Sequence, residues 1–146
     1  MKKASSDLLL LDVNVLLAMA WPNHQFHVAA IEALSSRNRW ATCALTQLGF
    51  IRLSSNPAAI ATAKSPQEAA ALLARLVADS LHIYLDSLPA PASEGWRDAF
   101  AMLLGHQQVT DAYLLKLAAA NNAVIVTFDR RLESLAGGQP RVTVLG

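Results

Sequence analysis

A carboxylate interrupts the most apolar run of the chain, and its position limits how the first segment can fold. Four leucines, Leu8–Leu11, lead directly into Asp12, and the apolar run resumes after Asn14. An unpaired charge is too costly to bury in an apolar interior. We therefore expect a buried strand over residues 7–13 that brings Asp12 to the edge of a sheet, where its carboxylate can meet a partner or a cation.

The composition indicates one ordered globular domain over residues 1–146. Of the 146 residues, 53% are hydrophobic and 16% are charged, which suits a single well-covered core. The net charge of +1 provides no overall field toward nucleic acid or membrane. Affinity for phosphate would therefore need a local group of cations or a metal ion. The single cysteine, Cys43, excludes an intrachain disulfide and a cysteine-rich zinc site.

The amino-terminal segment resembles a secretion signal only in part. Lys2 and Lys3 precede the leucine run, but Asp12 and Asn14 interrupt the apolar stretch in the middle, where an export signal carries neither residue. The uninterrupted apolar runs are too short to cross a bilayer. We expect a protein that works in the cytoplasm without membrane contact.

Short apolar segments alternate with helical patterns along the rest of the chain. We expect further strands near residues 40–45, 81–85, 123–127 and 141–145. We expect helices over residues 24–36, 47–53, 65–77, 93–105 and 130–135 and from residue 110 onward, with caps at Asn23, Ser65, Ser93 and Thr110. This alternation predicts an α/β three-layer sandwich, in which a mainly parallel sheet of four to five strands carries helices on both faces.

Two later carboxylates lie in settings similar to that of Asp12. Asp111 falls in the first turn of an expected helix, and Asp129 follows the expected strand over residues 123–127. Each acid alone could be a cap or a turn residue. Functional groups of open α/β sheets gather at the carboxyl ends of the strands, however, so all three acids can face one cleft.

Three carboxylates in one cleft would need a cation. Two carboxylates about 5 Å apart repel by roughly 3 kcal/mol at an effective dielectric constant near 20. Oxygen ligands without converging cysteines favour Mg²⁺, or alternatively Mn²⁺, over zinc. The residues therefore suggest one metal site assembled by the fold.

Four short motifs follow one another along nearly the whole chain. They are Leu-Leu-Asp12-Val-Asn14-Val-Leu, Leu45-Thr46-Gln47-Leu-Gly49-Phe50-Ile-Arg52-Leu, Val-Thr110-Asp111-Ala-Tyr-Leu and Val-Thr127-Phe-Asp129-Arg-Arg. In this order they resemble the motif series of PIN-domain ribonucleases, most closely the VapC-type toxins of bacterial toxin–antitoxin pairs. The resemblance implies a Mg²⁺-dependent endoribonuclease that cleaves RNA, a cognate antitoxin protein that inhibits it, and a homodimer.

The resemblance also implies roles for individual residues. Asp12 and Asp111 would be the principal metal ligands, and Asp129 would complete the acidic site. Asn14 and Thr127 would orient the carboxylates, because carboxylates that bind metals are usually hydrogen-bonded themselves.

Three other positions have alternative roles. Gln47 stands where members of this family usually carry Glu, and its amide offers an oxygen but no charge, so the number of bound metal ions stays open. Arg52 would either steady a phosphate or pair with a nearby acid. Arg130 and Arg131 would either contact RNA or form a solvated helix end.

Two other functions stay compatible with the sequence. Gln47 would also suit a catalytically silent PIN-like module that binds RNA or a partner protein. A phosphoryl-accepting α/β domain also places an Asp after its first strand, but this chain has Asp12 and Asn14 there instead of two acids. A phosphate-binding Gly-rich loop and a nucleophile elbow are both absent from the sequence, which argues against P-loop NTPases and serine hydrolases.

Three aromatic side chains are expected at or near the surface. Trp21, Phe26 and Trp40 lie in or near expected loops and helix edges, and the mean hydropathy of the chain is +0.30. We expect a homodimer interface and an antitoxin segment to cover this apolar excess.

Overall fold

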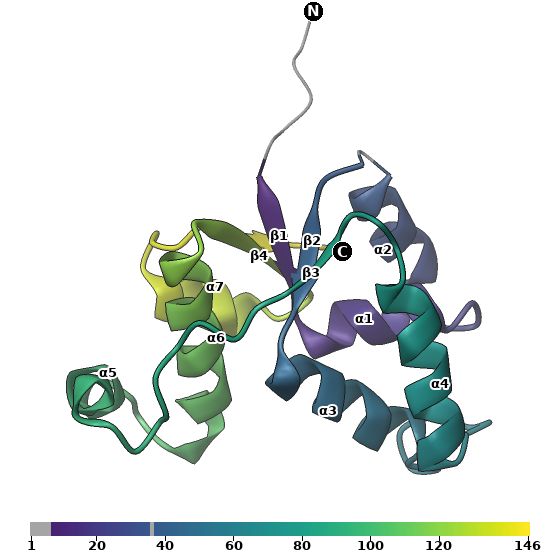
Figure 1. The fold of residues 1–146 in the computed structure, drawn as a ribbon, viewed down its shortest axis with the longest axis horizontal. Coiled ribbons are helices and arrows are strands. Elements are labelled where there is room, and N and C mark those ends of the chain that lie inside the picture. The colour runs from purple at the N-terminus through teal and green to yellow at the C-terminus, as the bar shows by residue number, and fades with distance from the viewer. Residues whose placement is uncertain (1–6, 36) are drawn as a thin grey trace, which may run out of the picture.

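Five parallel strands form one sheet in the computed structural model, which describes residues 7–35 and 37–146. The strands are β1 (Leu8–Leu11), β2 (Trp40–Thr42), β3 (His82–Tyr84), β4 (Ala123–Thr127) and β5 (Val142–Val144). They pair in the order β3-β2-β1-β4-β5, and every pairing is parallel (Figure 1). The predicted parallel sheet of an α/β sandwich is therefore confirmed.

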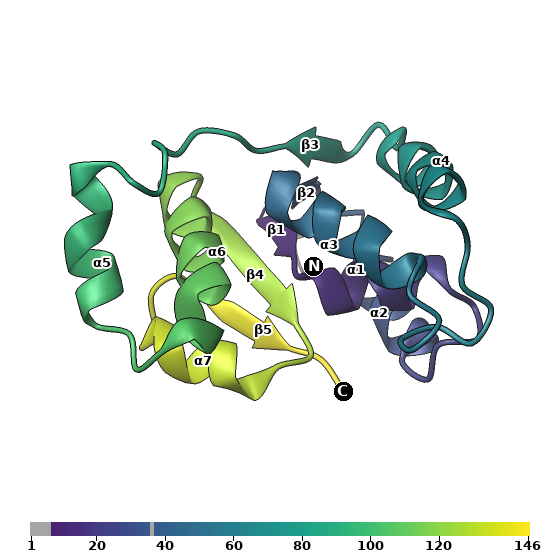
Figure 2. The same cartoon turned by 90° about the horizontal axis from the view of Figure 1, so that it is seen from below.

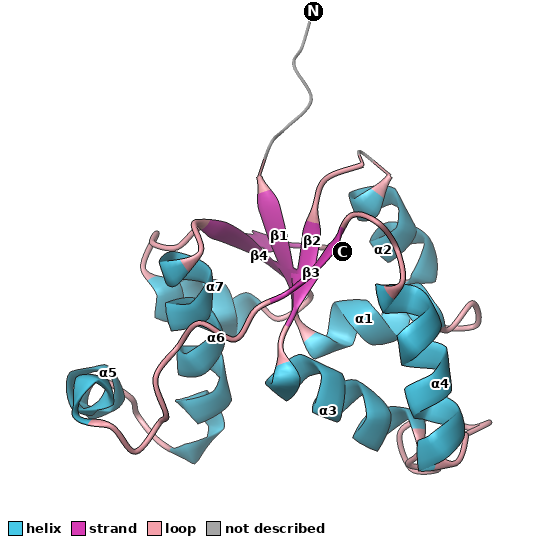
Figure 3. Ribbon diagram, viewed as in Figure 1, coloured by secondary structure: helices cyan, strands magenta, loops and turns pink. Residues whose placement is uncertain are grey.

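Helices cover both faces of the sheet (Figure 3). On one side lie α1 (Val13–Ala20), α2 (His27–Leu34), α3 (Ala44–Ser54) and α4 (Pro66–Val77), and on the other lie α5 (Arg97–Ala101), α6 (Val109–Ala120) and α7 (Arg130–Ala136). Among the described residues, no helix is both long enough and apolar enough to cross a membrane. Lys2 and Lys3 lie outside the described residues.

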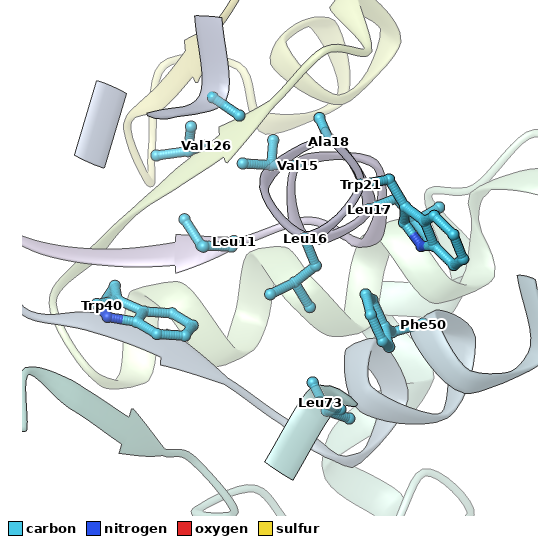
Figure 4. Packing of buried hydrophobic residues seen from close by; sticks show 11 residues of the cluster. Leu11, Val15, Leu16, Leu17, Ala18, Trp21, Trp40, Phe50, Leu73 and Val126 are labelled. Atoms are coloured by element: carbon cyan, nitrogen blue, oxygen red, sulfur yellow. The ribbon is translucent and has the colours of Figure 1, made fainter. Parts of the chain in front are cut away.

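Side chains alternate between the two faces of the sheet and divide the core into two clusters. On β1, Leu11 packs with residues of α1, α2, α3 and α4, whereas Leu10 packs with residues of α6 and α7. On β4, Val126 and Ile125 divide in the same way. Figure 4 shows the first of these clusters around helix α1. A strand covered on both faces is apolar at every position, which explains the unbroken leucine run.

The first strand is shorter than the sequence indicates, and a helix follows it at once. Strand β1 ends at Leu11, and Asp12 caps α1 by accepting a 2.8 Å hydrogen bond from the Val13 N–H at its Oδ1. The predicted strand over residues 7–13 therefore runs past the cap. Over so few residues, an apolar buried helix and an apolar buried strand have the same sequence pattern.

The predicted helix caps have mixed outcomes. Helix α2 begins at His27, so Asn23 does not cap it. Helix α6 begins at Val109, which places Thr110 inside its first turn. Ser65 is confirmed as the cap of α4, because its hydroxyl accepts the N–H of the glutamate three residues later at 3.1 Å.

The predicted helix over residues 93–105 is wrong beyond its middle. A 3₁₀ turn at Glu94–Trp96 continues into α5, which ends at Ala101, and a second 3₁₀ turn at His106–Gln108 leads into α6. Ser93 occupies the N-cap position of the first 3₁₀ turn, as predicted, but its hydroxyl donates to the Ala90 carbonyl at 2.6 Å and makes no capping hydrogen bond. The residues between α5 and α6 therefore form a connecting segment beside the start of α6.

Two of the three aromatic side chains expected at the surface are buried. Trp21 is 7% exposed and Trp40 is 5% exposed, so the prediction is wrong for both. Each indole N–H has a partner: Trp21 donates to Ser54 Oγ at 3.2 Å, and Trp40 donates to Asp79 Oδ2 at 2.8 Å. Phe26 is 36% exposed and agrees with the prediction.

Helix α3 approaches the start of α1 closely at Gly49. A Cβ atom there would lie 2.7 Å from Val13 Cγ2, and the branched valine side chain has little freedom to rotate away. We predict that Gly49→Ala lowers the free energy of unfolding by about 1 kcal/mol, because overpacking costs about 1–3 kcal/mol and the better helix propensity of alanine returns about 1 kcal/mol.

Thermal melting checks this prediction, and we expect the melting temperature to fall by about 2–4 °C. Gly95→Ala is the matched control, because a Cβ at Gly95 meets nothing within 4 Å. If Gly49→Ala melts at or above the wild-type temperature, α1 and α3 have room to separate at this contact.

Candidate active site

Strands β1 and β4 lie side by side at the point where the strand order reverses. The chain runs outward from β1 through β2 to β3 and then returns to the other side of β1 as β4. In Figure 2, α1 and α3 lie on the β1 side of this point, and α6 and α7 lie on the β4 side. Because Leu11 pairs with Val126, Asp12 and Thr127 emerge next to each other. Ligands of open α/β sheets bind in the crevice at such a position.

Thr127 is the centre of a hydrogen-bonded network that holds Asp12. Its hydroxyl donates to Asp12 Oδ2 at 2.7 Å and accepts from Asn14 Nδ2 at 3.4 Å and from the Asp129 N–H at 3.0 Å. Asn14 Oδ1 in turn accepts from the Phe128 N–H at 3.3 Å. Thr127 is completely buried. The structure therefore brings Asn14 and Thr127 together with Asp12.

Opposing influences act on the Asp12 carboxyl. Burial raises its pKa above the usual value, and the hydrogen bonds from Thr127 and Val13 lower it. The negative charge of Asp129 raises it again. Each Asp12 oxygen thus has one donor, and each retains a lone pair that can face the crevice.

Asp111 reaches the same site from the first turn of α6. Burial raises its pKa to about 6, and the charges of Asp12 and Asp129 act in the same direction, whereas the charge of Arg131 acts against them. Three acids from three separate elements therefore influence one another through their charges. A carboxyl with a pKa this far above its usual value marks a candidate functional group.

Asp129 is held by a cation. Its Oδ1 accepts the backbone N–H and the Nε–H of Arg131 at 2.9 and 3.1 Å, and its Oδ2 accepts Arg131 Nη2 at 2.9 Å. These bonds lower the pKa of Asp129. The same carboxylate also caps helix α7.

The donor set suits a metal ion that keeps much of its water shell. Within residues 7–35 and 37–146, no three His, Cys, Asp or Glu side chains lie close enough to hold one metal ion together. The charge of Asp12 raises the pKa of Asp111, whereas the Asp129 carboxylate forms an ion pair with Arg131. Mg²⁺ usually binds one or two carboxylates and retains several waters, so this pair fits that ion.

Gln47 and Arg52 extend from α3 but make different contacts. Gln47 Nε2 donates to Thr42 Oγ1 at 2.9 Å, and this hydroxyl lies 2.8 Å from His82 Nε2. Gln47 has no hydrogen bond to Asp12 within the described part of the chain. Arg52 is exposed and forms no ion pair with a described residue, so the acid partner considered for it is not found.

The contacts of Thr42 with Gln47 and His82 were not predicted from the sequence, although the position of Thr42 carries a signal. Thr42 follows two apolar residues at the end of β2, just as Thr127 follows an apolar run at the end of β4. A hydroxyl at the end of a buried strand must find a partner. That rule could have identified Thr42, whereas nothing local marks His82 as its neighbour.

The chain is similar to known proteins over most of its length. The family model of the PIN domain matches residues 9–138. Ribonuclease VapC39 from Mycobacterium tuberculosis strain H37Rv is 40% identical over 131 residues, which cover 87% of this chain and 92% of that protein. Ribonuclease VapC38 from the same strain is 36% identical over 137 residues, which cover 92% and 94%.

The fold has a counterpart among solved structures. A chain in the crystal structure of VapBC2 from Rickettsia felis, bound to a DNA fragment from their promoter, superimposes with a TM-score of 0.62. The match covers 95% of this chain and 99% of that one at 12% identity, so it bears on the fold alone. On the strength of the family model and the two sequence relatives, this chain belongs to the PIN-domain family, among its VapC ribonucleases.

Proposed function

We propose that this protein is a metal-dependent endoribonuclease that acts as the toxin of a toxin–antitoxin module. Its relatives at 36–40% identity over most of the chain are named ribonucleases, which supports the nuclease class. The assignment of the site rests on the two hydrogen bonds that hold the Asp12 carboxylate and on its electrostatic interaction with Asp111. The Asp111 carboxyl has its pKa raised to about 6 by burial and by the charges of Asp12 and Asp129. A divalent cation would relieve this repulsion.

Asp12 and Asp111 would hold Mg²⁺, or alternatively Mn²⁺, and Asp129 would complete the acidic site. Such an ion would supply Lewis-acid chemistry, which would polarise a phosphodiester and lower the pKa of an attacking water. The chain's own residues prepare the ligands. The Val13 N–H fixes Asp12 Oδ1 and the Thr127 hydroxyl fixes Asp12 Oδ2, so that the carboxylate is oriented before any ligand arrives.

Arg131 would control access to the third acid. Its guanidinium holds both oxygens of Asp129 and has a side chain that is 80% exposed. A phosphate group that draws this guanidinium away would free Asp129 to face the other two acids, because arginine binds phosphates and carboxylates with the same planar geometry.

The proposed partners are an RNA substrate, a cognate antitoxin and a second copy of this chain. The VapBC2 structure from Rickettsia felis supports the antitoxin by analogy of fold. Exposed apolar side chains such as that of Phe26 leave surface for protein partners. We also propose that the protein acts in the cytoplasm.

A catalytically silent module that binds RNA or a protein is the second candidate. It is favoured by the engagement of Gln47 with Thr42 and by the lack, among the described residues, of three acids close enough to bind one ion. Divalent-metal binding by calorimetry and an RNA-cleavage assay separate the two candidates.

Removing one charge from the acidic pair should stop catalysis and preserve the fold. We predict that Asp12→Asn and Asp111→Asn each reduce divalent-dependent RNA cleavage by more than roughly 100-fold, because altering even the groups that orient a ligand costs about 10- to 100-fold. The measurement is cleavage of labelled RNA with Mg²⁺ and with a chelator, alongside circular dichroism.

Glu32→Gln is the matched control for this experiment, because Glu32 is an exposed acid on α2, outside the site. It should cleave at the wild-type rate. A folded Asp12→Asn protein that cleaves RNA as fast as the wild type would contradict the metal-dependent mechanism.

The Thr127 hydroxyl should matter for both metal affinity and stability. Thr127→Val removes the donor to Asp12 Oδ2 and leaves the Asp129 N–H without its acceptor. We predict a 10- to 100-fold loss of Mg²⁺ affinity, which corresponds to about 2 kcal/mol. We also predict a loss of about 1–3 kcal/mol in the free energy of unfolding, because a buried donor loses its partner.

Titration calorimetry and denaturant unfolding measure these two effects. Thr127→Ser keeps the hydroxyl and should remain close to the wild type in metal affinity. Equal Mg²⁺ affinity in Thr127→Val and Thr127→Ser would mean that Asp12 needs no orienting donor.

A further inference from the structure

A cavity of about 600 Å³ lies directly beside the acidic site. Its wall includes Asp111 from α6 and Arg131 from α7. The first of these is one of the three acids, and the second is the cation paired with Asp129. A molecule bound in this cavity would therefore touch the site where the proposed cleavage takes place.

The segment between α5 and α6 contributes much of the remaining wall, and it presents apolar side chains to solvent. Met102 is 81% exposed and Leu104 is 93% exposed, although both are large and apolar. The segment is held in shape, because the Leu104 N–H donates to Gln108 Oε1 at 2.7 Å and the Gln108 N–H donates to the Gly105 carbonyl at 3.2 Å. The segment that carries Met102 and Leu104 is therefore held by two hydrogen bonds.

Amide groups lie in the same cavity as these apolar side chains. Gln107 and Gln108 both line it. Gln108 uses its carbonyl oxygen to accept the Leu104 N–H, so its NH₂ group is the part left for a ligand. Gln107 is exposed and can offer both its oxygen and its NH₂ group.

This combination suits a nucleobase. A base has two apolar faces, which Met102 and Leu104 can contact, and an edge of donors and acceptors, which the amides can meet. The phosphate next to such a base would lie toward Arg131, whose guanidinium matches phosphate geometry. A peptide could contact the apolar side chains equally well, but the shared wall with Asp111 favours a part of the substrate.

We propose that this cavity binds the nucleobase next to the cleaved phosphodiester and thereby helps to select the cleavage site. The inference rests on the proposed endoribonuclease function and adds a base-binding subsite to it. Leu104 and Met102 contact the base, Gln107 and Gln108 read its edge, and Asp111 marks the border with the metal-binding acids.

The test combines RNAs that lack single bases with substitutions in the cavity. The cleavage position is first mapped on a single-stranded RNA cut by the wild type with Mg²⁺. RNAs carrying one abasic nucleotide on either side of that position are then compared by kcat/KM. For the wild type, we expect one flanking abasic position to slow cleavage by roughly 10-fold or more, which is the scale of losing the burial of one Leu or Met side chain.

Leu104→Ser provides the decisive comparison, because a side chain that is 93% exposed can be changed without disturbing the core. We expect this variant to cut the intact RNA roughly 10-fold more slowly, because it loses one apolar contact, and to be nearly insensitive to the abasic position. Gln107→Ala should reduce the abasic effect as well. Val28→Ser is the matched control, since Val28 is 66% exposed on α2 and outside the cavity, and it should keep the full abasic effect.

The outcomes separate the subsite from the function on which it rests. If the wild type cuts no RNA, the endoribonuclease proposal fails and the subsite fails with it. If the wild type cuts RNA and the abasic effect is the same in Leu104→Ser, only the subsite is wrong. If Leu104→Ser keeps its base dependence but escapes inhibition by the antitoxin, the cavity serves a protein partner and the subsite is again wrong.

Discussion

The hydrogen bond from the Thr127 hydroxyl to Asp12 joins the ends of strands β1 and β4, and the candidate site depends on it. It forms because Leu11 pairs with Val126, which brings the next residue of each strand together. The same hydroxyl accepts the Asp129 N–H and so fixes the turn into α7. A shift of one residue in this register would turn Thr127 to the other face of the sheet. Core packing and the geometry of the acids are therefore set by one strand pairing.

The acidic site works against the stability of the metal-free protein. Burial and neighbouring charges raise the pKa of Asp111 to about 6. A carboxyl whose pKa is higher in the folded than in the unfolded state favours folding most when it is protonated, below its unfolded pKa of about 4. That contribution is lost as the pH rises toward 6 and the acid ionises in the folded protein. Apolar packing on both sides of the sheet offsets the destabilisation caused by the ionised Asp111, and a bound cation would reduce that destabilisation.

The parallel sheet, most of its helices and the placement of the three acids at the boundaries of elements could be predicted, because they rest on local patterns and on the rule that strand ends carry function. Helix α1 could not, because residues 15–18 are all buried and show no polar face that would reveal a helical period. The burial of Trp21 and Trp40 depends on Ser54 and Asp79, which are distant in sequence. The engagement of Gln47 with Thr42 depends likewise on how α3 leaves β2, which no residue pattern specifies.

Acids from three separate elements influence one another through their charges, and we propose that a divalent cation completes this acidic site. Carbon-detected NMR titration of the Asp111 carboxyl, with and without Mg²⁺, tests this proposal most directly. We predict that the pKa of Asp111 is about 6 in the metal-free protein and falls markedly when Mg²⁺ is added. In the metal-free Asp12→Asn variant, the pKa of Asp111 should also fall, but by less, because the charge of Asp12 is only one of the causes of the shift. An Asp111 carboxyl that titrates near its ordinary value of 3.8, and that responds neither to Mg²⁺ nor to Asp12→Asn, would contradict the account.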